Sequence, residues 1–132
     1  MDPVWKPDQD DRDPLTHAVI GAAIEVHRGL GPGLLESAYE ACLCHELHTL
    51  GIPFKRQVGL PLAYKGVRLD CGYRLDLFVD DRLIVELKCA EKIDDIHKAQ
   101  LLTYLRLAGV RTGLLLNFHT AYMRDGLLRM VL

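Results

Sequence analysis

The stretch of residues 73–89, YRLDLFVDDRLIVELKC, constrains the fold most, because it has the pattern of two short apolar strands joined by a polar turn. Strand side chains alternate between two faces, so the odd-numbered leucines and valines between positions 75 and 87 are expected on one face. The opposite face then carries charged residues, among them Asp76, Glu86 and Lys88. The sequence therefore predicts a β-hairpin with one apolar face and one charged face.

The length of the turn decides whether these charges meet. If residues 80–82 form a three-residue loop, Asp76 lies opposite Glu86 on the same face, and Lys88 lies two residues further along. If only two residues form the turn, Asp76 faces Val85 instead, because a slip of one residue exchanges the two faces of a strand. A shared site for the two carboxylates therefore requires a loop of odd length or a bulge.

A simpler interpretation stays open for the same residues. The second face of the hairpin could be exposed to water, with Asp76 and Glu86 in surface ion pairs with Arg74 and Lys88. Short patterns of this kind are hypotheses until the surrounding structure is known. The rest of the chain must decide between a site and a solvated face.

Composition bounds the class of protein. A chain of 132 residues predicts one domain with a core of normal size, which we place at residues 13–132, after a flexible tail of residues 1–12 rich in Asp and Pro. The formal net charge of -2 argues against binding nucleic acid through bulk positive charge. The N-terminus lacks a signal-like apolar core and no stretch is long enough to span a membrane, so a cytoplasmic protein without membrane association is expected.

The four cysteines do not have the spacing of a metal or cluster site. They lie at positions 42, 44, 71 and 89, without any CxxC pair. Cys42 and Cys44 would point in different directions from a helix, so they cannot readily share a metal ion. We therefore expect no iron-sulfur cluster, and reduced thiols that are mostly buried.

Hydrophobic periodicity predicts an alternation of helices and strands. Helices are expected over residues 14–28, 34–50 and 94–108, and strands over residues 54–62, 67–71, 73–79, 83–89, 112–118 and 127–132. The continuous apolar run at 112–118 follows a strand and a helix, so a right-handed crossover should place it parallel to the hairpin. This order predicts an α/β fold with a mixed central sheet flanked by helices.

The charged face of the hairpin has the chemistry of a divalent-metal site. Mg²⁺ prefers carboxylates, carbonyls and waters, and often uses only one or two protein carboxylates. Asp76 and Glu86 would supply these, and the backbone carbonyl of Leu87 a third oxygen, with Lys88 placed to orient or deprotonate an attacking water. Such a set suits metal-dependent phosphodiester hydrolysis.

Three motifs carry a family resemblance. Asp76, followed by Glu86-Leu-Lys88, resembles the PD-(D/E)XK nuclease superfamily, and Gln100 with Tyr104 resembles the QxxxY element of its RecB-like branch. The segment GLLESAY, residues 33–39, looks like the signature of the small GxxExxY proteins of that superfamily. The name-giving proline is absent, since Leu75 precedes Asp76.

The resemblance implies a restriction-endonuclease-like core in the order α-β-β-β-α-β. Asp76 and Glu86 would be metal ligands and Lys88 the catalytic lysine, while Glu36 would be the acid of the early helix that reaches the site directly or through water. Gln100 and Tyr104 would position the substrate, or alternatively form a buried pair with only a packing role.

Two further residues are candidates from their positions alone. His97, three residues before Gln100, shares a side of the predicted helix with it and with Tyr104, and Arg74 is a candidate phosphate contact. A surface role is the alternative for both.

The leading hypothesis is thus a Mg²⁺- or Mn²⁺-dependent nuclease, with DNA favoured over RNA as substrate. The alternative is a catalytically silent module that binds nucleic acid or protein with the same fold. A homodimer formed along the edge strand near residues 127–132 is a third interpretation.

Overall fold

The computed structural model describes residues 13–132, which form three α-helices, seven β-strands and one short 3-10 helix. In chain order these are α1 (Pro14–Leu30), α2 (Glu36–Thr49), β1 (Phe54–Gly59), β2 (Leu62–Tyr64), β3 (Val67–Leu69), β4 (Arg74–Val79), β5 (Leu83–Lys88), α3 (Asp95–Ala108), β6 (Thr112–Asn117), η2 (Met123–Gly126) and β7 (Leu127–Val131). The predicted flexible tail, residues 1–12, lies outside the described residues, so that prediction is not tested.

Five strands form the central sheet in the order β1-β4-β5-β6-β7. β5 and β6 are parallel and the other three neighbouring pairs are antiparallel, so the sheet is mixed and α3 is the crossover between the parallel pair. The predicted parallel placement of the strand after α3 is confirmed. The order of α2, β1, β4, β5, α3 and β6 matches the expected α-β-β-β-α-β core, with the small β2–β3 hairpin inserted between the first two of its strands.

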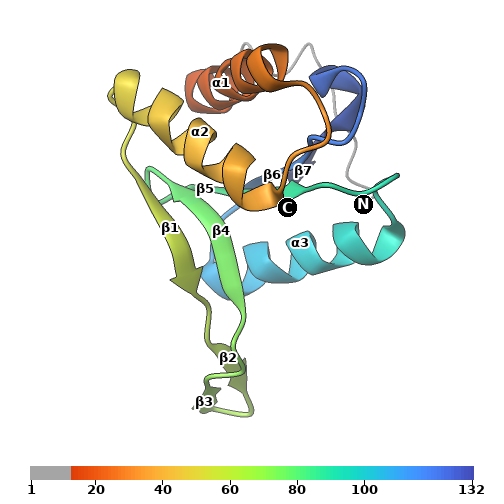
Figure 1. Cartoon of the computed structure of the whole chain (residues 1–132). Helices are drawn as coiled ribbons and strands as arrows, with labels where there is room; N and C mark the ends of the chain where they lie inside the picture. The colour runs from red at the N-terminus through yellow and green to blue at the C-terminus, as the bar shows by residue number, and fades with distance from the viewer. Residues whose placement is uncertain (1–12) are drawn as a thin grey trace.

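The sheet lies between two helical layers, which Figure 1 shows as α1 and α2 on one face and α3 on the other. Each face has its own apolar cluster. The α1/α2 side buries Val85, Leu87 and Leu114, and the α3 side buries Ile84 and Leu115, because successive strand residues point to opposite faces. The α/β fold with a mixed sheet flanked by helices, predicted from the sequence, is therefore confirmed.

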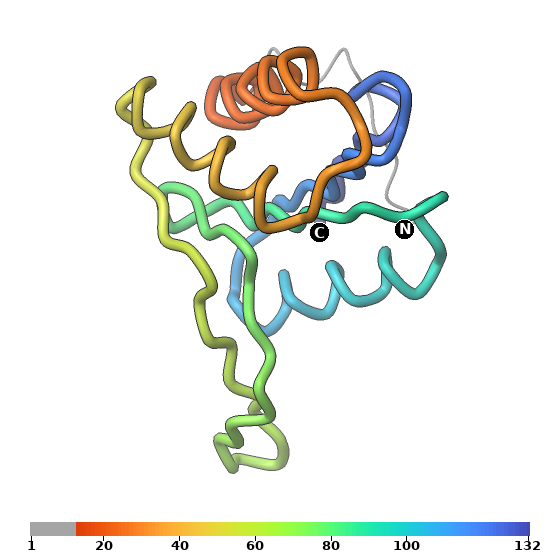
Figure 2. Tube along the Cα trace, in the orientation of Figure 1, coloured from red at the N-terminus to blue at the C-terminus, as the bar shows by residue number. Residues whose placement is uncertain are grey.

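The predicted strand 54–62 is divided into two. β1 ends at Gly59, and β2 begins at Leu62 in a separate two-stranded sheet with β3. Pro61 lies at the break, where it has no N–H to donate to a sheet. The β2–β3 hairpin consequently leaves the main sheet and projects beyond α3, as the chain trace shows (Figure 2).

The predicted sharing of one face by Leu75 and Leu77 is wrong. Leu77 packs on the α1/α2 side, whereas Leu75 packs on the α3 side with Ile84. The change of face occurs where Gln57, with a φ of 50°, lies across from Asp76 in the β1–β4 ribbon. A regular strand would keep both leucines on one side, so the backbone twists at the position of the candidate site.

The prediction of mostly buried thiols is also wrong. All four cysteines are free, but only Cys44 is buried, while Cys42 and Cys89 are half-buried and Cys71 is exposed. Among residues 13–132, no helix has the length and apolar character required to cross a membrane.

Candidate functional site

The β4–β5 hairpin has the three-residue loop that the shared site requires. Val79 pairs with Leu83, so residues 80–82 form the loop, and Arg82 donates its N–H to the Val79 carbonyl at 3.1 Å. Asp80 and Asp81 adopt positive φ angles of 51° and 54°, which Asp tolerates better than most residues. The predicted three-residue loop is therefore confirmed. The β4–β5 pairing ends at Leu77 and Val85, the residues next to Asp76 and Glu86.

At this position the two carboxylates replace backbone pairing. The Asp76 N–H donates to Glu86 Oε2 at 2.7 Å, and the Leu87 N–H donates to Asp76 Oδ2 at 2.9 Å. Each carboxylate thus reaches across to the backbone of the other strand. Because the N–H and C=O of one strand residue point to the same side, the Leu87 carbonyl also faces β4. Two carboxylates and one carbonyl therefore converge on the gap between the strands.

Burial raises the pKa of both acidic groups. Burial raises the pKa of Glu86 to about 8, and the charge of Asp76 raises it too. The hydrogen bond from the Asp76 N–H and the charge of Lys88 act in the opposite direction and lower it. Burial also raises the pKa of Asp76, while the Leu87 N–H and Lys88 lower it and the charges of Glu40 and Glu36 raise it. A site with this excess of negative charge would gain free energy from a bound cation.

Lys88 lies at the end of β5 and lines a pocket of about 480 Å³. The pocket is completed by Leu62 and Tyr73 beside the hairpin and by residues of α3, namely Ile96, His97, Ala99, Gln100, Thr103, Tyr104 and Leu107. The predicted common side of the α3 residues His97, Gln100 and Tyr104 is therefore confirmed. Within residues 13–132, the Lys88 ammonium group makes no ion pair or hydrogen bond, although its charge lowers the pKa of both carboxyl groups.

Tyr104 connects this pocket to the carboxylates. Burial raises the pKa of its hydroxyl, and the charges of Glu86 and Asp76 act in the same direction, as does Tyr73. The Tyr73 and Tyr104 rings lie 6.1 Å apart between their centroids. The α3 pocket and the acidic pair therefore belong to one electrostatic environment.

His97 already has a local structural role. Its Nδ1 accepts the Asp94 N–H at 3.0 Å, as part of the capping box that begins α3. A neutral ring with an accepting Nδ1 carries its proton on Nε2. Toward the pocket, neutral His97 can therefore donate a hydrogen bond but cannot accept a proton.

Glu36 is held in place by the loop before α2. Fully buried Tyr39 donates its hydroxyl to the Gly31 carbonyl at 2.5 Å and accepts the Leu34 N–H at 3.1 Å. Its ring stacks on Phe118 at a centroid distance of 4.4 Å. Tyr39 is therefore a core residue, and its hydroxyl bonds to the segment from which Glu36 begins the helix.

Glu36 itself is exposed and lies within electrostatic range of the site. Its charge raises the pKa of Asp76 and of Cys89. In the described part of the chain, no three His, Cys, Asp or Glu side chains lie close enough together to hold a metal ion. Glu36 is therefore not a third direct ligand beside Asp76 and Glu86 in this arrangement.

Glu40 is a residue that the sequence interpretation missed. It is 7% exposed, and its Oε2 accepts Arg56 Nη2 at 2.9 Å while its Oε1 accepts Gln57 Nε2 at 2.7 Å. The charge of Glu40 raises the pKa of Asp76 by more than the charge of Glu36 does. A signal existed, because Glu40 follows Glu36 by four residues and so lies on the same face of α2.

Arg74 is not brought into the Lys88 pocket. It is exposed at the start of β4, and its Nη1 donates to the Gln57 carbonyl at 3.3 Å. Its role as a phosphate contact therefore stays a prediction.

The donor set fits a hard divalent cation. Asp76, Glu86 and the Leu87 carbonyl offer oxygen only, and Mg²⁺ commonly uses one or two carboxylates together with waters. The raised pKa values of both carboxyl groups give an independent reason for a cation at this position.

Comparison with known proteins agrees with this geometry. Residues 13–130 match the model of the PD-(D/E)XK nuclease superfamily, and this span contains every residue of the acidic pair, the lysine and the α3 pocket. No curated protein and no solved structure gives a significant match. The mixed sheet between helices is accordingly a restriction-endonuclease-like fold. The match covers most of the chain, so this protein belongs to the PD-(D/E)XK nuclease superfamily.

Proposed function

We propose that this protein is a metal-dependent nuclease that hydrolyses phosphodiester bonds, with Asp76, Glu86 and Lys88 at its centre. The observation that carries the proposal is the crossed pair of carboxylates between β4 and β5, with Lys88 two residues after Glu86. The superfamily consists typically of nucleases, which supports the same reaction class.

Asp76, Glu86 and the Leu87 carbonyl would hold Mg²⁺ or Mn²⁺, and Glu36 would contribute through a water. When bound, such an ion lowers the pKa of water and stabilises charge on a phosphoryl group. The backbone N–H groups of Asp76 and Leu87 keep the two carboxylates in place, so little reorganisation is needed when a cation binds.

Lys88 would orient the attacking water or stabilise the negative charge that develops on the phosphoryl oxygens. Support for this role comes from its position, because it lines the pocket beside the carboxylates and has no partner that would hold its ammonium group elsewhere. A positioned cation of this kind commonly contributes a factor of about 100 or more to the rate.

The α3 residues would position the substrate. Gln100 and Tyr104 both line the pocket and offer hydrogen-bonding groups to a phosphate or a base, and neutral His97 offers a donor from Nε2. Arg74 would act further out, as a phosphate contact on the exposed side of β4.

We also assign the chain to the GxxExxY group and to the RecB-like branch, on residues 33–39 and on Gln100 with Tyr104. The bond from Tyr39 to the loop gives a physical reason for the first motif, since it fixes the start of α2. We propose DNA as the favoured substrate and the cytoplasm as the location, which the four free thiols support. We further propose that the protein forms a homodimer through β7, which is an edge strand of the sheet.

The test is cleavage of single- and double-stranded DNA and RNA in Mg²⁺, in Mn²⁺ and in EDTA. We expect cleavage with either metal, none in EDTA, and loss of cleavage in Asp76→Asn. Lys55→Ala is a suitable control, because Lys55 is exposed and pairs only with Asp81 on the surface. A folded protein that cleaves none of these substrates, or cleaves equally well in EDTA, would refute the proposal.

Binding of the metal separates the enzyme from the silent module. Titration calorimetry with Mn²⁺ should give binding that Asp76→Asn abolishes. A protein that binds nucleic acid but neither binds metal nor cleaves would be the module instead.

A further inference from the structure

The inserted β2–β3 hairpin has no core of its own. We define the arm as residues 61–74, and every residue in it from position 63 onward is exposed. β2 and β3 pair only with each other, and the arm projects away from the helical layers (Figures 1 and 2). A two-stranded hairpin alone is at best marginally stable in water, so the arm gains little within this molecule by itself.

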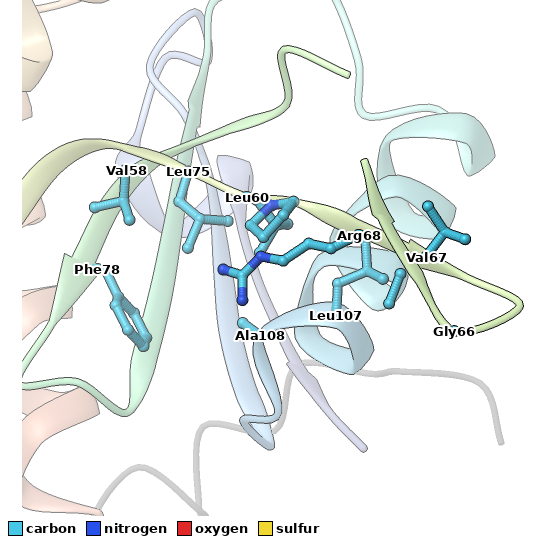
Figure 3. A pocket seen from close by; sticks show the side chains of 11 residues that line it. Val58, Leu60, Gly66, Val67, Arg68, Leu75, Phe78, Leu107 and Ala108 are labelled. Atoms are coloured by element: carbon cyan, nitrogen blue, oxygen red, sulfur yellow. The ribbon is translucent and has the colours of Figure 1, made fainter. Parts of the chain in front are cut away.

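The register of the arm separates two faces. Leu62 pairs with Leu69 and Tyr64 with Val67, so these four side chains share one face, and the intervening pair of Ala63 and Arg68 lies on the other. Arg68 reaches back over an apolar pocket of about 440 Å³ between the arm and the end of α3 (Figure 3). Val67 of the first face lines this pocket together with Ala63 and Arg68 of the second face, so the two faces meet at its rim.

The first face continues into the candidate active site. Leu62 from this face lines the same pocket as Lys88 and Tyr104, and Tyr73 at the return of the arm lines it too. Tyr64 and Tyr73 remain 58% and 43% exposed, with the Lys65 ammonium group 5.4 Å from the Tyr64 ring centroid and the Tyr73 ring beside Tyr104. Tyr73 thus borders the Lys88 pocket directly, whereas Tyr64 lies further out on the arm, on the same face as Leu62.

The arm is positively charged within an acidic protein. Lys65, Arg68 and Arg74 against Asp70 give three positive charges and one negative, a net charge of +2, whereas the whole chain has -2. None of the three cations forms an ion pair with a carboxylate among residues 13–132. The charge of the arm thus complements a polyanion.

We propose that the arm binds single-stranded nucleic acid and guides it to the Lys88 pocket, with bases on Tyr64 and Tyr73 and phosphates at Lys65 and Arg74. Exposed aromatic rings between cations are suited to single strands, whose base faces are free to stack, whereas a duplex hides them. The delivery of the strand to Lys88 rests on the proposed nuclease function. The inference adds that the substrate is single-stranded.

Binding can be measured without cleavage. Fluorescence anisotropy in EDTA would use a labelled oligonucleotide of about 20 nucleotides, long enough to span several stacking contacts. We expect the single strand to bind more tightly than a hairpin duplex of equal length. Tyr64→Ala should weaken binding of the single strand about 10-fold, whereas Tyr122→Ala, a change at a 70% exposed tyrosine outside the arm, should leave it unchanged.

Charge reversal tests the phosphate contacts. Lys65→Glu should weaken single-strand binding by about 5-fold and reduce its dependence on salt, because a counterion-releasing contact is lost. Lys55→Glu makes the same change of charge outside the arm. Its change in the logarithm of the dissociation constant should be less than half of that caused by Lys65→Glu. Thermal denaturation of each variant checks that it is folded.

The outcomes separate the arm from the catalytic proposal. Loss of binding in the arm variants supports the arm even if the wild-type protein cleaves nothing. Equal binding of duplex and single strand, or equal effects of Tyr64→Ala and Tyr122→Ala, would overturn the inference. It would also be overturned if light scattering showed a dimer that Tyr64→Ala dissociates while oligonucleotide binding is unchanged, because the occupant of the face would then be a second copy of the chain.

Discussion

Glu86 is the residue at which burial and repulsion act together most strongly. It is 5% exposed, it faces Asp76 across the hairpin, and its pKa is raised to about 8. In the metal-free protein much of this carboxyl group is therefore protonated at neutral pH. A bound cation would reverse this preference and favour the carboxylate.

This pKa predicts how stability depends on pH. Glu86 ordinarily titrates near 4.5, so between that pH and about 8 the folded state keeps a proton that the unfolded chain has lost. Stability in EDTA should therefore fall as pH rises through this window, by at most about 1.4 kcal/mol per pH unit. Urea denaturation between pH 5 and pH 8.5 measures it.

Glu86→Gln should make this pH dependence much shallower, because the amide does not titrate. Glu25→Gln, at an exposed position on α1, serves as the control and should keep the wild-type slope. An equally steep slope in Glu86→Gln would show that another group causes it.

Glu40 gives a second prediction for a single residue. Glu40→Ala leaves Arg56 and Gln57 without their partner next to Asp76. Arg56 and Gln57 are exposed, so water can replace the lost partner, and the free energy of unfolding should fall by about 0.5–1.5 kcal/mol. Chemical denaturation measures it, with Glu46→Ala on the same helix as the control. Equal losses in the two variants would contradict a special role for Glu40.

Single residues also show what the sequence could predict. The pairing of Asp76 with Glu86 follows from local alternation and the loop length, and the common side of His97, Gln100 and Tyr104 follows from helical spacing. The bond from Glu40 to Arg56 joins residues 16 apart and depends on how α2 lies across β1, which no local pattern specifies.

At the scale of elements, the loop between α1 and α2 positions the acidic start of α2. Tyr39→Phe would keep the stacking on Phe118 but leave the Gly31 carbonyl and the Leu34 N–H without their partner. We expect a loss of about 1–3 kcal/mol in the free energy of unfolding. Urea denaturation of Tyr39→Phe measures this loss.

Tyr122→Phe removes an exposed hydroxyl and should change nothing measurable. If Tyr39→Phe were as stable as the wild-type protein, the hydroxyl would not hold the loop, and the proposed basis of the 33–39 motif would be wrong.

Element boundaries followed the sequence where caps and periodicity agree. α1 begins at Pro14 and α3 ends at Ala108 before Gly109, both as predicted. The change of face between Leu75 and Leu77 was not predictable, because alternation assumes a regular strand, whereas the β1–β4 pairing is interrupted at Gln57, which has a positive φ. The separate arm was also missed, since the apolar pattern runs through Pro61 without a visible gap.

At the scale of the whole molecule, the fold brings three separate parts of the chain close to the β4–β5 hairpin. The hairpin supplies Asp76, Glu86 and Lys88, α2 supplies Glu36 and Glu40, and α3 supplies the opposite wall of the pocket. The arm extends this wall outward. The arrangement accounts for a small acidic protein acting on a polyanion, because positive charge is needed only along the path to the site.

The central claim is that Lys88 acts together with the crossed carboxylates in phosphodiester cleavage. The most direct test is single-turnover cleavage of a labelled oligonucleotide in Mg²⁺ by the wild-type protein, Lys88→Ala and the control Lys55→Ala. We predict that Lys88→Ala lowers the rate by about 100-fold or more while leaving the fold intact, and that Lys55→Ala cleaves at the wild-type rate. A folded Lys88→Ala variant that cleaves at the wild-type rate would contradict the claim.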